Sequence, residues 1–246
     1  MGKAVTMTRI GGNNDGSSAV DVDEVGSSDE DEEGIEVQMP NSPNDQNPKQ
    51  IKALAESTDL SLLIARDKHW EAAALRCRLR PNEAGEALEV KVRGAYTAKI
   101  TPLLFACEHN PSVEVIQALI KANPKSLKRR QDPGGQLPIH AACTWGASPA
   151  VIDVLLSTDP TMAEEQDFLS NLPLHCACYS GAETSIIRAL LRVYPLSVWP
   201  RNHLGSSAVD IVKRLSHPNR REVLALLDMT TKNLLNKKKK ETKKAE

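Results

Sequence analysis

Three copies of one pattern lie between residues 101 and 195, and this repetition limits the possible folds more than any other feature of the sequence. The copies read TPLLFACEHNPSVEVIQALIKANP, LPIHAACTWGASPAVIDVLLSTDP and LPLHCACYSGAETSIIRALLRVYP, at 101–124, 137–160 and 172–195. Their closing prolines are 36 and 35 residues apart, at Pro124, Pro160 and Pro195. One such unit cannot bury its own hydrophobic face, so the pattern predicts units that stack on their neighbours.

Each copy has the apolar spacing of a helix shortly before its closing proline. In the first copy these residues are Val115, Ile116, Leu119 and Ile120. In the other two copies they are Ile152, Leu155 and Leu156, then Ile187, Leu190 and Leu191. This spacing places them on one side of a helix. Each unit is therefore predicted to be a turn, a short helix and a second apolar helix that ends at the proline.

The periodic region predicts one domain over residues 51–228. Its first part, 58–81, reads as two short helices broken near Asp67–Lys68, and we expect it to cap the stack at its N-terminal end. Residues 82–100 are expected to form a longer connection. Repeats start near residues 96, 132 and 167. A degraded fourth copy within 202–228 is expected to cap the C-terminal end.

The segments on either side of this domain carry opposite charges. Residues 1–50 hold three basic and eleven acidic side chains, a net charge of −8, whereas 228–246 hold seven lysines and three acidic side chains, a net charge of +4. We expect the acidic segment 1–50 and the lysine-rich tail 229–246 to be disordered, because they cannot bury enough apolar area. Ser27 and Ser28 directly precede five acidic residues. They are candidate phosphorylation sites for acidophilic kinases, and a purely solvating acidic tail is the alternative.

Cysteine usage and hydropathy bear on the compartment. No apolar run approaches the roughly 18 residues that span a bilayer, and no secretory signal pattern opens the sequence. The five cysteines then read as free thiols of a reducing compartment. We expect a protein of the cytoplasm, the nucleus or both. The start MGKAVT also fits the myristoylation pattern at Gly2, although the acidic tract behind it disfavours an anionic membrane.

The copies resemble the ankyrin repeat, whose signature D-x-x-G-x-T-P-L-H-x-A returns about every 33 residues. The resemblance rests on DPGGQLPIHAAC, DFLSNLPLHCAC, TPLLFAC and NHLGSSAVDIV, at 132–143, 167–178, 101–107 and 202–212. Here the period is 35–36, Leu137 and Leu172 replace the usual Thr, and a Pro follows each second helix. The resemblance implies an all-α ankyrin-repeat solenoid of about five stacked helix-turn-helix units, with disordered charged tails.

The cysteines and histidines of the copies are reactive residue types, yet they recur as part of the repeat. One repeat position is held by Cys107, Cys143 and Cys178. We expect these thiols to stack in the interior as small hydrophobes. In ankyrin repeats the motif histidines, here His140 and His175, help to tie the turn to the helix start. We expect no metal and no cofactor, because a zinc site with Cys176 would lack a second ligand pair. The alternative is a metal-dependent enzyme or sensor that uses His140, His175 and Cys176.

By the same resemblance, a partner protein binds the turn tips and the exposed ends of the short helices on the concave face. Carried onto this chain, these positions are Glu108, His109, Gln136, Thr144, Trp145, Phe168, Leu169, Tyr179 and His203. The chain has only three Trp, three Tyr and two Phe. Trp145, Phe168 and Tyr179 are therefore the expected anchors, since Trp and Tyr are enriched at binding hot spots. The alternative is that Trp145 and Tyr179 pack on each other or on a tail.

We expect a non-catalytic adaptor or scaffold that binds another protein. No phosphate-binding loop, nucleophile elbow, HExxH motif or dinucleotide fingerprint is present, so we expect no enzyme. We also expect a monomer without specific nucleic-acid binding, because the lysine tail lacks Arg and aromatic residues. The alternative is a nuclear regulatory protein whose tail, 232–246, links a partner to chromatin or nucleic acid through non-specific contacts. The basic loop at 125–130 is a further candidate contact for an acidic partner.

Overall fold

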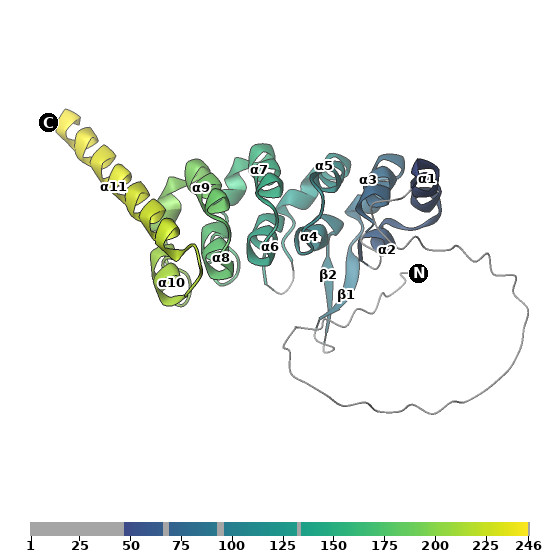
Figure 1. The fold of residues 1–246 in the computed structure, drawn as a ribbon, viewed down its shortest axis with the longest axis horizontal. Coiled ribbons are helices and arrows are strands. Elements are labelled where there is room, and N and C mark those ends of the chain that lie inside the picture. The colour runs from purple at the N-terminus through teal and green to yellow at the C-terminus, as the bar shows by residue number, and fades with distance from the viewer. Residues whose placement is uncertain (1–46, 66–68, 93–95, 132–133, 246) are drawn as a thin grey trace, which may run out of the picture.

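The computed structural model describes residues 47–65, 69–92, 96–131 and 134–245. Their helices form two rows along an elongated stack (Figure 1). The short-helix row consists of α2 (Leu60–Ala65), α4 (Pro102–Cys107), α6 (Pro138–Trp145), α8 (Pro173–Ser180) and α10 (Ala208–Arg214). The long-helix row consists of α1 (Pro48–Ser57), α3 (Trp70–Leu79), α5 (Val113–Ala122), α7 (Pro149–Thr158), α9 (Thr184–Val193) and α11 (Arg220–Ala245). Each helix packs on its neighbours in the stack, which confirms the expected helical solenoid.

The repeat motif sets where the short helices begin and end. A proline occupies the first position of α4, α6 and α8, where a missing N–H costs nothing. Gly146 and Gly181 end α6 and α8 in the left-handed conformation, with φ of 73° and 70°. This conformation lets the following residue donate a hydrogen bond back into the helix, from Ala147 N to Ala142 O for α6 (2.9 Å).

The prolines that close the long helices begin a further element. Each starts a short 3-10 helix: η2 (Pro124–Lys128), η3 (Pro160–Glu164) and η4 (Pro195–Val198). The residue before each proline lies outside the α region, as at Asn123 with φ of −143° and ψ of 85°, because a following proline disfavours that region. The long helix therefore stops at that residue, and the 3-10 helix leads the chain back toward the next turn.

The hydrophobic core runs through the whole stack and consists mainly of Leu, Ile, Val, Ala and Cys side chains. At its N-terminal end it contains a buried arginine, Arg76, which is only 3% exposed. The guanidinium donates to both carboxylate oxygens of Glu83, at 2.8 and 2.6 Å, and to the carbonyl oxygens of Ala55 and Glu56. Arg76 thereby joins α1, α3 and η1 (Pro81–Gly85).

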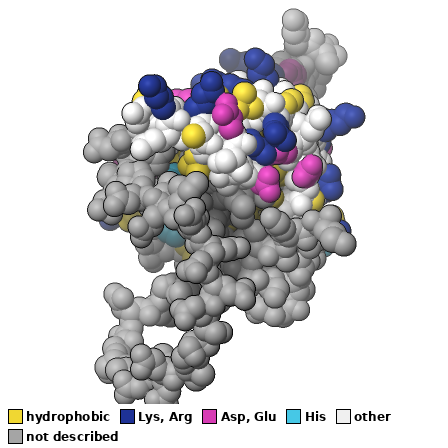
Figure 2. Space-filling model, turned by 90° about the vertical axis from the view of Figure 1, so that its right-hand side faces the viewer, with side chains coloured by type: hydrophobic (Ala, Val, Ile, Leu, Met, Phe, Trp, Pro, Cys, Tyr) yellow, Lys and Arg dark blue, Asp and Glu magenta, His cyan; other side chains and the backbone are white. Residues whose placement is uncertain are grey.

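The end of the stack that α1 forms is polar. Lys49, Lys52 and Glu56 of this helix are exposed. Figure 2 looks onto this end and shows Lys and Arg side chains interspersed with Asp and Glu, with hydrophobic groups only in separate patches. A terminal unit needs such an outer face, because no further repeat covers it. No helix was expected from the sequence at 48–57.

The connection at 82–100 differs from the expectation of an all-α chain. Strands β1 (Leu88–Val92) and β2 (Tyr96–Ile100) pair antiparallel, with Leu88 opposite Ile100. The hairpin extends away from the helices on the side of the short-helix row (Figure 1). The two residues at its base are buried, Leu88 at 8% and Ile100 at 3% exposure, so the stack holds the hairpin by its base.

The lysine-rich tail also differs from the expectation, because α11 continues without a break to Ala245. Val223 and Leu227 anchor the helix in the core, and Leu234 packs partly against it. A helix once nucleated by packing propagates readily through Lys and Glu, which are good helix formers. Four predictions concern residues outside the described part of the chain: the disorder at 1–46, the break at Asp67–Lys68, the phosphorylation of Ser27 and Ser28, and the myristoylation of Gly2.

Candidate protein-binding surface

Three successive turns are joined to each other through their main chains. In each turn a main-chain hydrogen bond joins the first residue to the last: Gln131 N to Gln136 O at 2.8 Å, Asp167 N to Asn171 O at 3.0 Å, and Asn202 N to Ser206 O at 3.1 Å. Between the turns, Phe168 N donates to Gly134 O (3.2 Å) and His203 N donates to Leu169 O (2.9 Å). We call residues 131, 134–136, 167–171 and 202–206 the turn ladder. These bonds fix the turns relative to one another.

Buried polar side chains shape the second and third turns. The Asp167 carboxylate accepts the N–H groups of Leu169 and Asn171, at 2.9 and 2.8 Å. Asn202 stands 35 residues later in the sequence, and its Oδ1 likewise accepts two N–H groups of its own turn, those of Leu204 and Ser206. Its Nδ2 donates to Asn171 Oδ1 at 2.9 Å. The recurring Asp or Asn therefore shapes its own turn, and Asn202 also ties the third turn to the second.

The motif histidines connect each short helix to the next repeat. His140 Nδ1 accepts the Leu137 N–H (3.2 Å), and its Nε2 faces the carbonyl oxygens of Glu165 and Asn171 at 3.0 and 3.1 Å. His175 accepts from Leu172 N and faces Pro200 O in the same way. This pattern requires neutral rings with the proton on Nε2. Burial lowers the pKa of both imidazoles, against the raising effect of nearby carbonyls and of Asp167.

The cysteine side chains lie in the core. Cys107, Cys143 and Cys178 are at most 2% exposed, and all five cysteines are free thiols. Burial raises the pKa of Cys178, as it does that of Cys77 and Cys176, to about 12. Within the part of the chain that the structure describes, no three His, Cys, Asp or Glu side chains form a group that could hold a metal ion.

The largest exposed apolar side chains of the turn ladder belong to its second and third turns. Phe168 is 58%, Leu169 60% and Leu204 76% exposed. Phe168 is nevertheless held in place, because its ring covers Gly135: a Cβ at Gly135 would stand only 2.3 Å from Phe168 Cδ1. The second turn therefore presents two apolar side chains, one fixed against the first turn and one directed to solvent.

Two of the predicted aromatic anchors lie at the ends of neighbouring short helices. Trp145 is the last residue of α6 and is 44% exposed, and Tyr179 in α8 is 37% exposed. Tyr179 Oη lies 3.4 Å from Asn202 Nδ2. The structure therefore places Tyr179 beside the third turn and relates it to the turn ladder.

The remaining predicted binding residues differ in the exposure of their side chains and in the contacts that they already make within the protein. His203 is exposed, and its Nδ1 lies 3.2 Å from Ser170 Oγ. Gln136 and Glu108 are half-buried. Thr144 donates to His140 O (2.8 Å), and the ring of His109 stacks on Phe105 with centroids 4.2 Å apart. Thr144 and His109 thus have contacts within the protein, and their binding role stays a prediction.

Sequence reasoning missed two features near this surface. The basic loop is tied to the next repeat: Lys128 pairs with Asp159 at 3.2 Å, and Arg130 pairs with Glu165 at 2.5 Å. A hollow beside Leu204 is also lined by basic residues of α10, including Lys213 and Arg214. The spacing could have indicated the hollow, because Arg214 stands 35 residues after Tyr179 and so occupies the same repeat position. The degraded fourth copy, however, is typical of a cap rather than of a binding unit.

Comparison with known protein families agrees with this geometry. Residues 103–199 match the family model described as ankyrin repeats, in 3 copies. No curated protein matches the chain. Among the described helices, none is both long and apolar enough to cross a bilayer. The repeats at residues 103–199 are therefore ankyrin repeats.

Proposed function

We propose that this chain is a non-catalytic adaptor or scaffold whose partner protein lies across the turn ladder and the ends of α6 and α8. Ankyrin repeats are in general protein–protein interaction modules. The observation that carries the proposal is the set of exposed apolar side chains on a hydrogen-bonded framework. Its members are Trp145, Phe168, Leu169, Tyr179 and Leu204.

The energetics favour binding at this surface. Large apolar side chains gathered on a rigid surface gain about 25 cal/mol for each Å² that a partner removes from water. Because Phe168 and Tyr179 are already positioned by contacts with Gly135 and Asn202, a partner pays little entropy to order them. This combination of aromatic anchors and low ordering cost is typical of binding hot spots.

The reactive residue types do not offer a competing catalytic site. Both nitrogens of His140 and His175 face main-chain partners. The thiol of Cys178 is buried, with its pKa raised to about 12, so almost none of it is the nucleophilic thiolate at neutral pH. These groups stabilise the repeats, which supports a role in binding rather than in chemistry.

A photo-crosslinking experiment tests the location of the binding surface. Benzoylphenylalanine would replace Leu169 in one protein and Leu196 in a control; Leu196 is 45% exposed and lies in η4, which packs against α9 and α11. We expect partner adducts from position 169 and none of the same mass from position 196. Equal adducts from both positions, or adducts only from 196, would contradict the proposal.

A nuclear protein that contacts nucleic acid through its C-terminus is the second candidate. The exposed lysines Lys237, Lys238, Lys239, Lys240 and Lys243 lie on α11 beyond the packed part of the helix. Binding of this kind falls steeply with salt, because each phosphate contact releases counterions. Affinity for duplex DNA measured between low and physiological salt, with and without residues 232–246, tests this candidate; an unchanged affinity after the deletion would refute it.

A further inference from the structure

The turn ladder has an open edge at its third turn. Gly134 O accepts Phe168 N, and Leu169 O, 35 residues later, accepts His203 N. The next acceptor in this series is Leu204 O, again 35 residues later. Among the described residues, none donates a main-chain hydrogen bond to it. A segment laid against this edge can therefore supply an N–H group and continue the ladder.

The last unit also lacks the side-chain contact by which the preceding unit is joined to the repeat that follows it. His175 extends to Pro200 of the following repeat. Thirty-five residues later stands Asp210, whose carboxylate stays within its own unit: it accepts Ser207 N at 3.0 Å and Ser207 Oγ at 2.8 Å, and pairs with Arg201 at 2.8 Å. The third turn is thus complete without a further repeat, which leaves its edge accessible.

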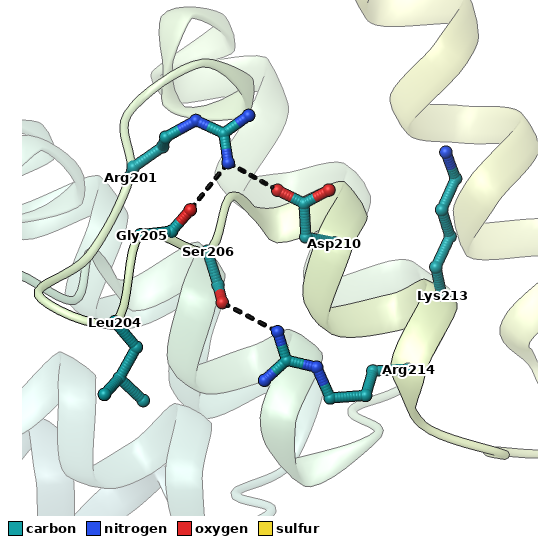
Figure 3. Close-up of a pocket in the computed structure, with 7 residues that line it drawn as sticks. All are labelled: Arg201, Leu204, Gly205, Ser206, Asp210, Lys213 and Arg214. Atoms are coloured by element: carbon teal, nitrogen blue, oxygen red, sulfur yellow. Dashed lines mark hydrogen bonds and ion pairs between the residues drawn. The ribbon is translucent and has the colours of Figure 1, made fainter.

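A shallow hollow of about 470 Å³ lies at this edge. Figure 3 shows that residues of the third turn line one side and residues of α10 the other. Leu204, the most exposed of the large apolar side chains at 76%, stands at its rim. The hollow is therefore continuous with the apolar side chains of the turn ladder.

The hollow has an excess of positive charge. Three cationic side chains, those of Arg201, Lys213 and Arg214, line the hollow with one carboxylate, that of Asp210. The Ser207 hydrogen bonds and Arg201 already engage this carboxylate. The Arg214 guanidinium donates to Ser206 Oγ at 3.0 Å, and no carboxylate of the described residues pairs with it or with Lys213. Two cationic groups are thus left to bind an anion, and Arg214 offers the planar donor arrangement that suits a carboxylate.

We propose that the hollow binds an extended acidic segment of the partner protein, with a main-chain N–H donating to Leu204 O and carboxylates contacting Arg214 and Lys213. This inference rests on the proposed function and names the chemistry of the partner. An open carbonyl acceptor beside an exposed leucine suits a peptide, which brings N–H groups and apolar side chains together. The phosphate backbone of a nucleic acid has the negative charge but not this combination of N–H groups and apolar side chains.

The test uses the full-length chain and a displayed library of random twelve-residue peptides. We expect the enriched peptides to carry Asp or Glu within a few positions of an apolar residue. For synthetic copies of them, Lys213→Gln combined with Arg214→Gln should weaken binding about tenfold, which corresponds to 1.4 kcal/mol. Lys213→Gln alone, which removes no described contact, should weaken binding in part even if Arg214→Gln impairs folding. The control is Lys121→Gln, which removes an exposed lysine of α5 and should leave affinity unchanged.

The outcomes separate this inference from the proposed function. Failure to enrich acidic peptides, or equal affinity in wild type and the Lys213→Gln, Arg214→Gln variant, overturns it. If Leu169→Ser nevertheless abolishes binding of the peptides that are enriched, the proposed function stands without the acidic specificity. If neither change matters, both proposals fail. Should neutralising Asp29, Glu30, Asp31, Glu32 and Glu33 raise the affinity for acidic peptides, the chain's own acidic segment occupies the hollow, and the assignment to a partner is wrong.

Discussion

The ring of Phe168 covers Gly135, so that the second turn of the ladder rests on the first at a place where only a hydrogen atom fits. A Cβ at Gly135 would lie 2.3 Å from Phe168 Cδ1, and Gly135 itself has a φ of 65°. The residue type at 135 therefore controls both the backbone of the first turn and the position of an aromatic side chain on the proposed binding surface.

Gly135→Ala is expected to destabilise the protein by more than the cost of its backbone conformation alone. A left-handed conformation costs an alanine about 1–2 kcal/mol, and the displaced Phe168 ring adds to it. Gly205→Ala is the matched control: it has a φ of 69°, and nothing lies within 4 Å of its Cβ position. Urea denaturation of both variants, with and without Phe168→Ala, checks this. Phe168→Ala should restore part of the stability lost in Gly135→Ala and none of that lost in Gly205→Ala; any other pattern would contradict the contact between Phe168 and Gly135.

Acidification below about pH 6.5 is expected to destabilise the fold through His140 and His175. Burial lowers the pKa of both imidazoles in the folded state, so the unfolded chain binds protons that the folded chain does not. Stability from these groups is fully present above the unfolded-state pKa of about 6.5 and is lost as the pH falls below it. Thermal melts from pH 7.5 to 5.0 should show a falling midpoint. The His140→Asn, His175→Asn double variant should be less stable at pH 7.5, and its melting midpoint should change less between pH 7.5 and 5.0. A change in midpoint as large as that of the wild type would contradict the role of these two histidines.

Arg76→Met should cost about 3–5 kcal/mol, because the buried Glu83 carboxylate loses its charged donor and keeps only the Leu60 N–H, and two carbonyl oxygens lose the same donor. Burial alone would raise the pKa of Glu83, yet the hydrogen bonds from Arg76 and from Leu60 N, together with the Arg76 charge, lower it and so favour the charged carboxylate. The comparison is Arg192→Met, whose pair with Asp153 spans 3.5 Å and whose side chain is 74% exposed. That change should cost less than about 1 kcal/mol. Urea denaturation measures the free energy of unfolding of both variants. Similar losses in the two would refute the stabilising role of the buried Arg76–Glu83 pair.

The five thiols should resist alkylation as long as the protein is folded. All five are buried, and burial raises the pKa of Cys77, Cys176 and Cys178 to about 12. Iodoacetamide at pH 8 should therefore label none of them in the native state and all of them in urea, as read by intact mass. Ser216→Cys adds an exposed thiol as a positive control. Rapid labelling of Cys143 or Cys178 in the native state would show that the stack opens between repeats.

The repeat positions could be read from the sequence because each has one structural role. Leucine at 137 and 172 replaces the usual Thr, and the structure explains how it is tolerated: His140 and His175 accept the N–H of these residues. The recurring Cys position likewise proved to be interior. Spacing reveals such roles, since a residue that returns in register meets the same neighbours in each repeat.

The β1–β2 hairpin and the long α11 were not predicted, for different reasons. The hairpin is a single copy, so no repetition marks it, and only Leu88 and Ile100 at its base are shown to pack in the core. The lysine-rich end of α11 has a composition typical of disorder, but Leu226 and Leu227 fix the start of the helix in the core. The basic hollow at α10 borders a turn against which no other turn of the described residues packs, and spacing alone does not show this.

The most direct test of the account is a quantitative affinity pull-down from native lysate with a Trp145→Ala, Tyr179→Ala double variant. Trp199→Ala is the control, because Trp199 is 45% exposed but follows η4 and belongs neither to the turn ladder nor to the ends of α6 and α8. Thermal melts would first establish that both variants fold. The account predicts that specific partners disappear with the double variant and remain with Trp199→Ala. Partners retained by the double variant, or lost only with Trp199→Ala, would contradict the claim that the turn ladder and the ends of α6 and α8 bind the partner.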